Sequence, residues 1–311
     1  MPATITRATP SPLRWGIATL ITMSAGKQLA QHAVTYTHQA MLLGRQLSAR
    51  YPAIPLFAIV LAEQVGPEDL ALLESACYQI QRRPALHPAY ATKHALPDVY
   101  RDQYMKFWLW NETGYDYIVY FDSDTFFRDP AALDFPGFFP LVSEERVVAC
   151  PTPWSHANPS PVTWNGGFFI LKPSAARFDQ LVNSPVAPGH FMGEYGASFQ
   201  WFDVSEMGAF MRDFPNFTTP SPIEDYCADI QFCCVQPKCE SRFHLPKSRG
   251  NMIHGLKPDG RVSPGASLSS IFDHQRLDVF ATWGYDPACL LTDFYEPLTL
   301  LYQKHGLLAR M

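Results

Sequence analysis

The first 125 residues alternate short apolar runs with longer segments whose apolar residues recur at helical spacing. The apolar runs are residues 16–22, 55–61 and 117–121, and each has the length of a buried strand. Helices are predicted between them over residues 32–50, 67–80 and 100–112. Strands without polar alternation are buried on both faces, as in a sheet covered by helices on each side. The predicted fold class is therefore α/β, with a mainly parallel central sheet and helices on both faces.

The rest of the chain predicts one large domain rather than several. A length of 311 residues with 47% hydrophobic side chains is enough for a sizeable core. Residues 1–13 are rich in Pro, Thr and Ser and are expected to be a flexible N-terminus. Two short strands are predicted at 146–149 and 167–171. Residues 185–222, rich in Gly, Pro and aromatics, predict an inserted loop or lid within a domain spanning 14–311. Residues 260–311 predict a C-terminal extension that ends in an amphipathic helix over 293–311.

Charge and composition exclude several functional classes. The net charge is −5 and no basic stripe is present, so nucleic acid is not an expected partner. No uninterrupted apolar run is long enough for a transmembrane segment, and the N-terminus lacks the order of a signal peptide. We therefore expect a cytoplasmic protein, or one on the cytoplasmic face of a membrane.

Seven cysteines are an odd number, which argues against a complete disulfide framework. Four of them cluster in the C-terminal half: Cys227, Cys233, Cys234 and Cys239. Their spacing does not match a paired zinc motif, so buried free thiols are favoured over structural zinc.

Asp122-Ser123-Asp124 directly follows the apolar run at 117–121. Ligands of parallel α/β sheets bind beyond the carboxyl ends of the strands, which is where these residues are predicted to lie. Alternate residues of an extended chain point to the same side, so Asp122 and Asp124 can approach one ion. Mg²⁺ and Mn²⁺ prefer carboxylate oxygens and often share them with substrate phosphates. The alternative is an ordinary turn and helix cap, since Asp and Ser are common turn residues.

Two other segments carry polar groups suited to the same site. Asn165-Gly166-Gly167 precedes an apolar run, where the glycines would let a ligand approach the backbone; a tight turn is the alternative. His254-Gly255-Leu256-Lys257 offers a nitrogen ligand and a phosphate-neutralising cation, or only surface side chains.

Lys106 lies on the helix that leads into the Asp122 strand, where a salt bridge is the alternative to a ligand contact. Asp225 and Asp229 precede an apolar stretch and are also explained as helix caps.

These elements together resemble, in order over most of residues 16–258, the glycogenin-like family of retaining glycosyltransferases. The stretch from Lys106 to Asp124 is the closest match, because the family has a Lys, a helix and then Tyr-Leu-Asp-x-Asp. Residues 16–22 resemble the family's first strand, which holds the uracil and ribose, and residues 41–47 its following helix. Residues 165–174 resemble its Asn-x-Gly strand followed by Pro-Ser.

The match is looser towards the C-terminus. His254 and Lys257 resemble the family's His…Gly-x-x-Lys-Pro-Trp element, but they stand closer together than usual and Asp259 replaces the Trp. Asp229-Ile-Gln231 matches the family's Asp-Gln segment only loosely.

The resemblance implies a GT-A nucleotide-sugar-binding fold, a Rossmann-like sheet with an Asp-x-Asp motif. It implies transfer of a hexosyl or N-acetylhexosaminyl group from a UDP-sugar to a glycan, glycoside or protein acceptor, with Mn²⁺ or Mg²⁺ as cofactor. It assigns the metal to Asp122, Asp124 and His254. The nucleotide-binding residues that it implies are the same two aspartates together with Leu20, Thr22, Lys106, Ser123, Gly255 and Lys257. The implied catalytic group on the sugar side consists of Lys106, Asn165, Asp229 and Gln231.

Other functions remain open at this point. The chain could be a catalytically silent nucleotide-sugar-binding protein or a sugar nucleotidyltransferase on a similar fold. A glycoside hydrolase fits poorly, because its two acids lie at least about 5 Å apart on opposite sides of a sugar.

Overall fold

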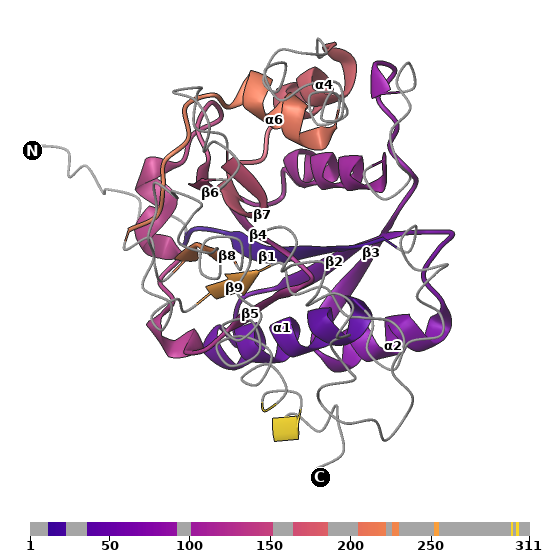
Figure 1. The fold of residues 1–311 in the computed structure, drawn as a ribbon, viewed down its shortest axis with the longest axis vertical. Helices are drawn as coiled ribbons and strands as arrows, with labels where there is room; N and C mark the ends of the chain where they lie inside the picture. Colours follow the sequence, from indigo (N-terminus) through magenta and orange to yellow (C-terminus); the bar gives the residue numbers. More distant parts are fainter. Residues whose placement is uncertain are drawn as a thin grey trace, which may run out of the picture.

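The computed structural model describes residues 12–22, 36–91, 101–151, 164–185, 205–221, 226–229, 252–254, 300 and 303–304. Their main feature is a six-stranded sheet with the order β3-β2-β1-β4-β7-β6 (Figure 1). The strands are β1 (Trp15–Ile21), β2 (Leu56–Leu61), β3 (Tyr78–Arg83), β4 (Tyr117–Asp122), β6 (Val148–Pro151) and β7 (Trp164–Leu171). Neighbours among β3, β2, β1 and β4 pair in parallel, whereas β7 runs antiparallel to β4 and β6. The predicted α/β class with a mainly parallel sheet is confirmed.

Helices cover both faces of this sheet (Figure 1). On one face lie α1 (Tyr36–Arg50) and α2 (Pro67–Ser75), which contact each other. On the other lie the 3-10 helix η2 (Asp102–Asn111) and the helices α4 (Ala175–Asn183) and α6 (Glu206–Asp213). The strand β5 (Thr125–Phe127) belongs to a second, smaller sheet. Two further 3-10 turns, η3 (Pro130–Ala132) and η4 (Pro136–Leu141), follow it in the chain.

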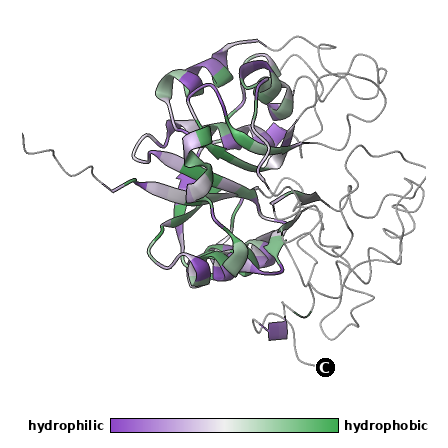
Figure 2. Cartoon of the chain, turned by 90° about the vertical axis from the view of Figure 1, so that its left-hand side faces the viewer, coloured by the Kyte–Doolittle hydropathy of each residue, from purple (hydrophilic) through white to green (hydrophobic). Residues whose placement is uncertain are grey.

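Side chains of the central strands alternate between two hydrophobic cores. In β4, Val119 and Phe121 belong to the core beneath α1 and α2, whereas Ile118 and Tyr120 belong to the core beneath η2 and α6. The strands β1 and β7 divide in the same way. Figure 2 shows these hydrophobic strands between helices of mixed polarity. Burial on both faces explains why the sequence of each strand is almost continuously apolar.

The helix predicted over residues 67–80 is shorter in the structure, where it is α2. It ends at Ser75, and Tyr78–Arg83 forms the edge strand β3 instead of its last turn. Cys77 between them has a φ of 69°, a left-handed conformation that reverses the chain after the helix. Parallel pairing of β3 with β2 therefore prevails over the helical spacing of the sequence.

Other boundaries differ more modestly. The predicted helix over 100–112 is 3-10 in form, and the strand predicted at 146–149 is shifted to Val148–Pro151. The segment predicted to be irregular, 185–222, contains the helix α6. Residues 300, 303 and 304 are helical, and the rest of the predicted helix at 293–311 lies outside the described residues. Among the described residues no helix combines the length and apolar character needed to cross a bilayer.

The prediction of free thiols is wrong for Cys227. Cys227 forms a disulfide with Cys150 of β6, with 5.4 Å between their Cα atoms. A sequence separation of 77 residues gives a stabilisation of about 4.5 kcal/mol on the chain-entropy argument. Cys227 is therefore excluded as a zinc ligand, and Cys233, Cys234 and Cys239 lie outside the described residues. Of the described cysteines, Cys77 is free and exposed.

Gly44 of α1 lies where the helix meets the start of β3. A Cβ atom there would lie 2.5 Å from Cε2 of Tyr78 and 2.8 Å from the carbonyl oxygen of Ala76. Tyr78 is buried and donates a hydrogen bond from its hydroxyl to the carbonyl of Ala40 at 3.0 Å. Close approach of α1 to the sheet therefore depends on glycine at this position.

Gly44→Ala is expected to lower the free energy of unfolding by about 1–3 kcal/mol, because overpacking exceeds the gain of about 1 kcal/mol in helix propensity. Urea unfolding measures the change. Gly114→Ala is the matched control, since a Cβ atom at Gly114 has nothing within 4 Å. Equal stability of the two variants would contradict the packing argument.

Candidate functional site

Asp122 and Asp124 lie at the carboxyl end of the central strand β4. Asp122 is the last residue of β4 and pairs in register with Leu20 of β1. Thr22 follows the end of β1 at the same edge of the sheet. The Asp122 side chain is 24% exposed, whereas Ser123 and Asp124 are buried. The structure thus brings the aspartates and the residues at the end of β1 to one edge, as predicted.

Lys106 of η2 reaches this edge from above the sheet. Its Nζ lies 3.0 Å from Oδ1 of Asp122 and donates a hydrogen bond of 3.1 Å to the carbonyl oxygen of Gly166. Nζ also lies 3.8 Å from Oε1 of Glu206. The Lys106 side chain is only 3% exposed, so its charge is stabilised by these oxygens rather than by water. The salt bridge considered for Lys106 is therefore formed, and its partner is a residue of the Asp-Ser-Asp motif.

Tyr120 fixes the same carboxylate from inside the sheet. Its hydroxyl donates a hydrogen bond of 2.5 Å to Oδ1 of Asp122, and its ring centre lies 5.3 Å from Nζ of Lys106. Burial, reinforced by the Asp122 carboxylate, raises the pKa of Tyr120. The phenol therefore stays protonated and holds Asp122 in one orientation at neutral pH.

Glu206 is a site residue that the sequence analysis missed. It is the first residue of α6, whose N-cap Ser205 accepts a hydrogen bond from the backbone N–H of Met207 at 3.2 Å. The side chain is 7% exposed, and Oε2 has no hydrogen-bond partner among the described residues. A Ser-Glu pair before an apolar helical repeat is a detectable helix-start signal, but it lies in the segment predicted to be irregular.

The electrostatic state of Glu206 follows from this burial. Burial raises the pKa of Glu206 to about 7; the Lys106 cation opposes the rise and Asp122 adds to it. Glu206 therefore exchanges its proton near neutral pH, unlike an ordinary carboxyl group.

Asn165, Gly166 and Gly167 lie within β7 rather than before it. Oδ1 of Asn165 accepts a hydrogen bond from the backbone N–H of Gly167 at 2.7 Å. A Cβ atom on Gly166 would lie 2.8 Å from Sδ of Met207 and 3.4 Å from Nζ of Lys106. Glycine at this position therefore lets the β7 carbonyl meet Lys106 while α6 packs over the strand.

A second, three-stranded sheet brings the C-terminal segments to the same place. Its order is β5-β9-β8, with β9 (Met252–His254) antiparallel to β5 and β8 (Ala228–Asp229) parallel to β9. Thr125, which follows Asp124, pairs with His254, and His254 pairs with Asp229. The backbones of three predicted site segments therefore lie side by side. Gln231, Gly255 and Lys257 are outside the described residues.

The described side chains fit a hard divalent cation in part. Asp122 and Asp124 supply carboxylate oxygens one residue apart at a strand end, and the backbone of His254 lies next to this pair in the small sheet. Such oxygens suit Mn²⁺ or Mg²⁺. Within the described part of the chain, no three His, Cys, Asp or Glu side chains are grouped to hold a metal. The third protein ligand thus stays a prediction.

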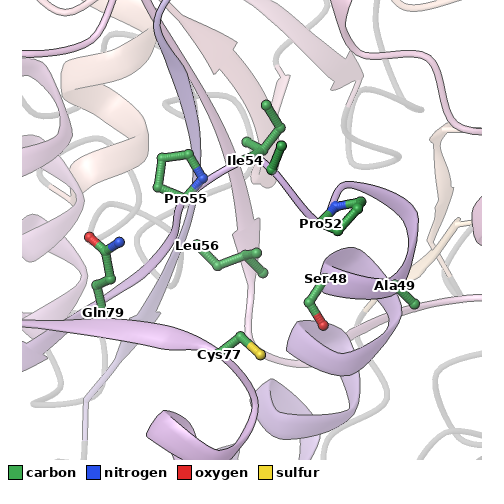
Figure 3. A pocket seen from close by; sticks show the side chains of 9 residues that line it. Ser48, Ala49, Pro52, Ile54, Pro55, Leu56, Cys77 and Gln79 are labelled. Atoms are coloured by element: carbon green, nitrogen blue, oxygen red, sulfur yellow. The ribbon is translucent and has the colours of Figure 1, made fainter.

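A cleft of about 540 Å³ lies at the other end of the sheet (Figure 3). Its walls come from the end of α1 and the starts of β2 and β3: Ser48, Ala49, Pro52, Ala53, Ile54, Pro55, Leu56, Cys77 and Gln79. These are the amino ends of the strands, whereas Asp122 is at a carboxyl end. None of the described residues that line the cleft has a carboxylate or cationic side chain, and none belongs to the candidate site.

The raised pKa of Glu206 gives a prediction for stability. The pKa of Glu206 is about 7 in the folded protein and 4.5 in the unfolded chain. Protonated Glu206 therefore stabilises the folded state fully below pH 4.5, and this stabilisation is lost as the pH rises through 7. In EDTA, the unfolding free energy of Glu206→Gln relative to the wild type should therefore rise by about 3 kcal/mol between pH 4.5 and 8. Urea unfolding at several pH values measures it. Glu63→Gln, at an exposed position, should change stability by less than about 0.5 kcal/mol throughout. A constant difference for Glu206→Gln would disprove the prediction.

Comparison with known proteins gives structural likenesses only. No protein-family model and no curated protein matches the sequence. Among solved structures, the chain is similar to the galactosyltransferase LgtC, solved with donor and acceptor sugar analogues, at 12% identity and a TM-score of 0.46, covering 86% of this chain and 95% of that one. It is also similar to mouse xyloside xylosyltransferase 1, at 12% identity and a TM-score of 0.49, covering 78% and 98% respectively. A third is the glycosyltransferase GlyE of Streptococcus pneumoniae TIGR4, at 11% identity and a TM-score of 0.44, covering 92% and 64%. With TM-scores below 0.5, these likenesses assign no role to any residue of this chain.

Proposed function

We propose that this protein is a metal-dependent retaining glycosyltransferase that moves a sugar from a UDP-sugar to an acceptor hydroxyl. The observation that carries the proposal is the buried Lys106–Asp122 pair at the carboxyl end of β4. A buried lysine that holds one carboxylate of an Asp-Ser-Asp motif, in a sheet of this class, is suited to a phosphate-containing ligand rather than to core packing. The ordered motif resemblance over residues 16–258 supports the same function.

The reaction requires stabilisation of a leaving nucleoside diphosphate. As the glycosidic bond breaks, negative charge develops on the diphosphate oxygens. Asp122, Asp124 and His254 would hold Mn²⁺ or Mg²⁺, which supplies positive charge at that place when bound. Lys257 would neutralise a phosphate oxygen as a second cation. Leu20, Thr22, Ser123 and Gly255 would bind the nucleotide.

Lys106 and Tyr120 act on the orientation of Asp122 in this proposal. Lys106 forms an ion pair with Oδ1 of Asp122 and Tyr120 donates a hydrogen bond to the same oxygen, so the carboxylate is held in place before a nucleotide-sugar binds. Nζ of Lys106 is already occupied by Asp122 and the Gly166 carbonyl, with Glu206 close by. Lys106 is therefore a positioning residue for the candidate ligand Asp122 in this proposal, and the third N–H donor of its Nζ serves the predicted contact to a sugar hydroxyl. Because the Asp122 carboxylate is already oriented, it needs little rearrangement when the metal and the nucleoside diphosphate bind.

The sugar itself would lie towards β7 and α6. Asn165, Asp229 and Gln231 are the predicted contacts to its hydroxyls and to its oxocarbenium-like carbon. Glu206 adds a buried oxygen without a partner among the described residues, and such an oxygen gains a hydrogen bond if a sugar hydroxyl donates to it. Hexoses and N-acetylhexosamines are both candidate donor sugars.

A donor screen tests the proposal. The purified protein is incubated with UDP-glucose, UDP-galactose, UDP-N-acetylglucosamine and UDP-xylose, with Mn²⁺ or EDTA, and both UDP release and thermal stability are measured. We expect UDP release with at least one donor, lost in EDTA, together with a higher melting temperature in the presence of that donor and Mn²⁺.

The alternatives give different results in the same screen. A silent binding protein would show the thermal shift without UDP release from any donor or added acceptor. A glycoside hydrolase would cleave simple glycosides regardless of EDTA. A shift with none of the UDP-sugars, with and without Mn²⁺, would exclude the proposed function.

A further inference from the structure

The disulfide between Cys150 and Cys227 joins the main sheet to the small sheet of the candidate site. Cys150 lies in β6, at the edge of the six-stranded sheet. Cys227 directly precedes β8, whose Asp229 pairs with His254. Both cysteines are buried. The disulfide therefore attaches the chain to β6 two residues before Asp229, a predicted site residue.

Tyr226 attaches the same segment by non-covalent contacts. Its hydroxyl accepts a hydrogen bond from the backbone N–H of Asp134 at 3.0 Å. Its ring packs against Phe138 in an edge-on arrangement, with ring centres 4.8 Å apart. The pair Tyr226-Cys227 thus anchors the chain to the core beneath α1 and α2.

The small sheet has few other attachments in the described part of the chain. The strand β5 holds one side because it continues from β4 through Asp122-Ser123-Asp124. On the other side β8 is two residues long and pairs with β9 alone. A two- or three-residue strand has too few hydrogen bonds to fix its own position. The place of β8 and β9 relative to Asp124 therefore depends strongly on the anchor at Tyr226-Cys227.

We infer that the Cys150–Cys227 disulfide is a positioning clamp for the donor site, and that its reduction weakens metal and donor binding while the six-stranded sheet stays folded. This inference rests on the proposed function. Two electrons and two protons from a dithiol reductant convert the disulfide into two thiols, and the reductant becomes a disulfide. Local opening of β8 and β9 then displaces the backbones of Asp229 and His254 from the Asp122–Asp124 pair.

The clamp makes the site sensitive to its redox surroundings. Disulfides persist in oxidising compartments and are rare in the reducing cytoplasm. The clamped form thus requires an oxidising environment, whereas a cytoplasmic location, as expected from the sequence, would favour the open form.

The first test compares oxidised wild type with Cys150→Ser/Cys227→Ser, using Cys77→Ser as the matched control because Cys77 is a free, exposed thiol. Measurements are made at a temperature at which circular dichroism shows every variant folded. We expect the double variant to raise the KM for the UDP-sugar and the half-saturating Mn²⁺ concentration at least tenfold, and to lower kcat because Asp229 is displaced from the proposed sugar site. Unchanged KM and Mn²⁺ dependence in the folded double variant would overturn the inference, because a bond with a purely structural role lowers only the melting temperature.

The second test needs neither a variant nor activity. Amide hydrogen exchange is followed by mass spectrometry in wild type before and after reduction with dithiothreitol and thiol blocking. Exchange should rise at least tenfold in residues 252–254 of β9 and stay unchanged in residues 56–61 of β2. Equal exchange in both forms, or an equal rise in β2, would refute the clamp. Absence of UDP-sugar turnover by the oxidised wild type would instead count against the proposed function, since the exchange result does not depend on turnover.

Discussion

Asp122→Asn and Asp124→Asn are each expected to lower kcat/KM for a UDP-sugar at least a thousandfold, which corresponds to about 4 kcal/mol of transition-state stabilisation. Asparagine keeps the size of the side chain but removes the negative charge that a divalent cation requires. The two carboxylates are not equivalent in the fold. Asp122 is also held by Lys106 and Tyr120, whereas Asp124 is buried next to the small sheet.

UDP release in Mn²⁺ measures the loss, and Mn²⁺ binding measured by calorimetry shows whether it arises at the metal. Asp179→Asn on the exposed side of α4 is the control, and it should keep full activity. If both site variants retained activity within tenfold of the wild type, the metal assignment would be wrong. Loss of activity with unchanged Mn²⁺ affinity would place the aspartates on the substrate instead.

Lys106→Met is expected to lower the free energy of unfolding by about 3–4 kcal/mol at neutral pH. The change removes the cation between two carboxylates and leaves the Gly166 carbonyl without its lysine donor. Removing one partner of a buried ion pair costs more than the pair contributes, because the remaining charge stays buried without compensation. Urea unfolding at pH 7.5 measures the loss.

The double variant Lys106→Met/Glu206→Gln separates charge from packing. Because glutamine needs no counter-charge, we expect the double variant to recover at least about 1 kcal/mol relative to Lys106→Met alone. Lys172→Met is the matched control; Lys172 is 46% exposed and 4.0 Å from Glu144, so its loss should cost less than about 0.5 kcal/mol. Equal effects of Lys106→Met and Lys172→Met would show that the buried lysine has no special electrostatic role.

Much of the fold could be predicted because the signal is local. The apolar runs that became β1, β2 and β4 are continuous and lie between helices of clear periodicity. The edge strand β3 was missed because five of its six residues are partly or fully exposed and its sequence continues the spacing of α2. Only pairing with β2 makes Tyr78–Arg83 a strand, and pairing is not a local property.

The candidate site divides in the same way. Asp122, Asp124 and Lys106 follow from motif and position, and the structure places them together. Glu206 was missed because its importance comes from burial beside Lys106, which joins residues 100 positions apart. The partner of Cys227 was missed because connectivity depends on where β6 meets the segment before β8.

The sequence alone determined an α/β chain with a mainly parallel sheet and two aspartates at the end of its central strand. It could do so because strand burial and turn chemistry are recorded in consecutive residues. The tertiary structure decided which groups surround those aspartates: the buried Lys106, the carboxyl group of Glu206 and the disulfide that leads into β8. These depend on chain segments distant in sequence, since burial and electrostatic contact arise only when the sheet and its helices have packed.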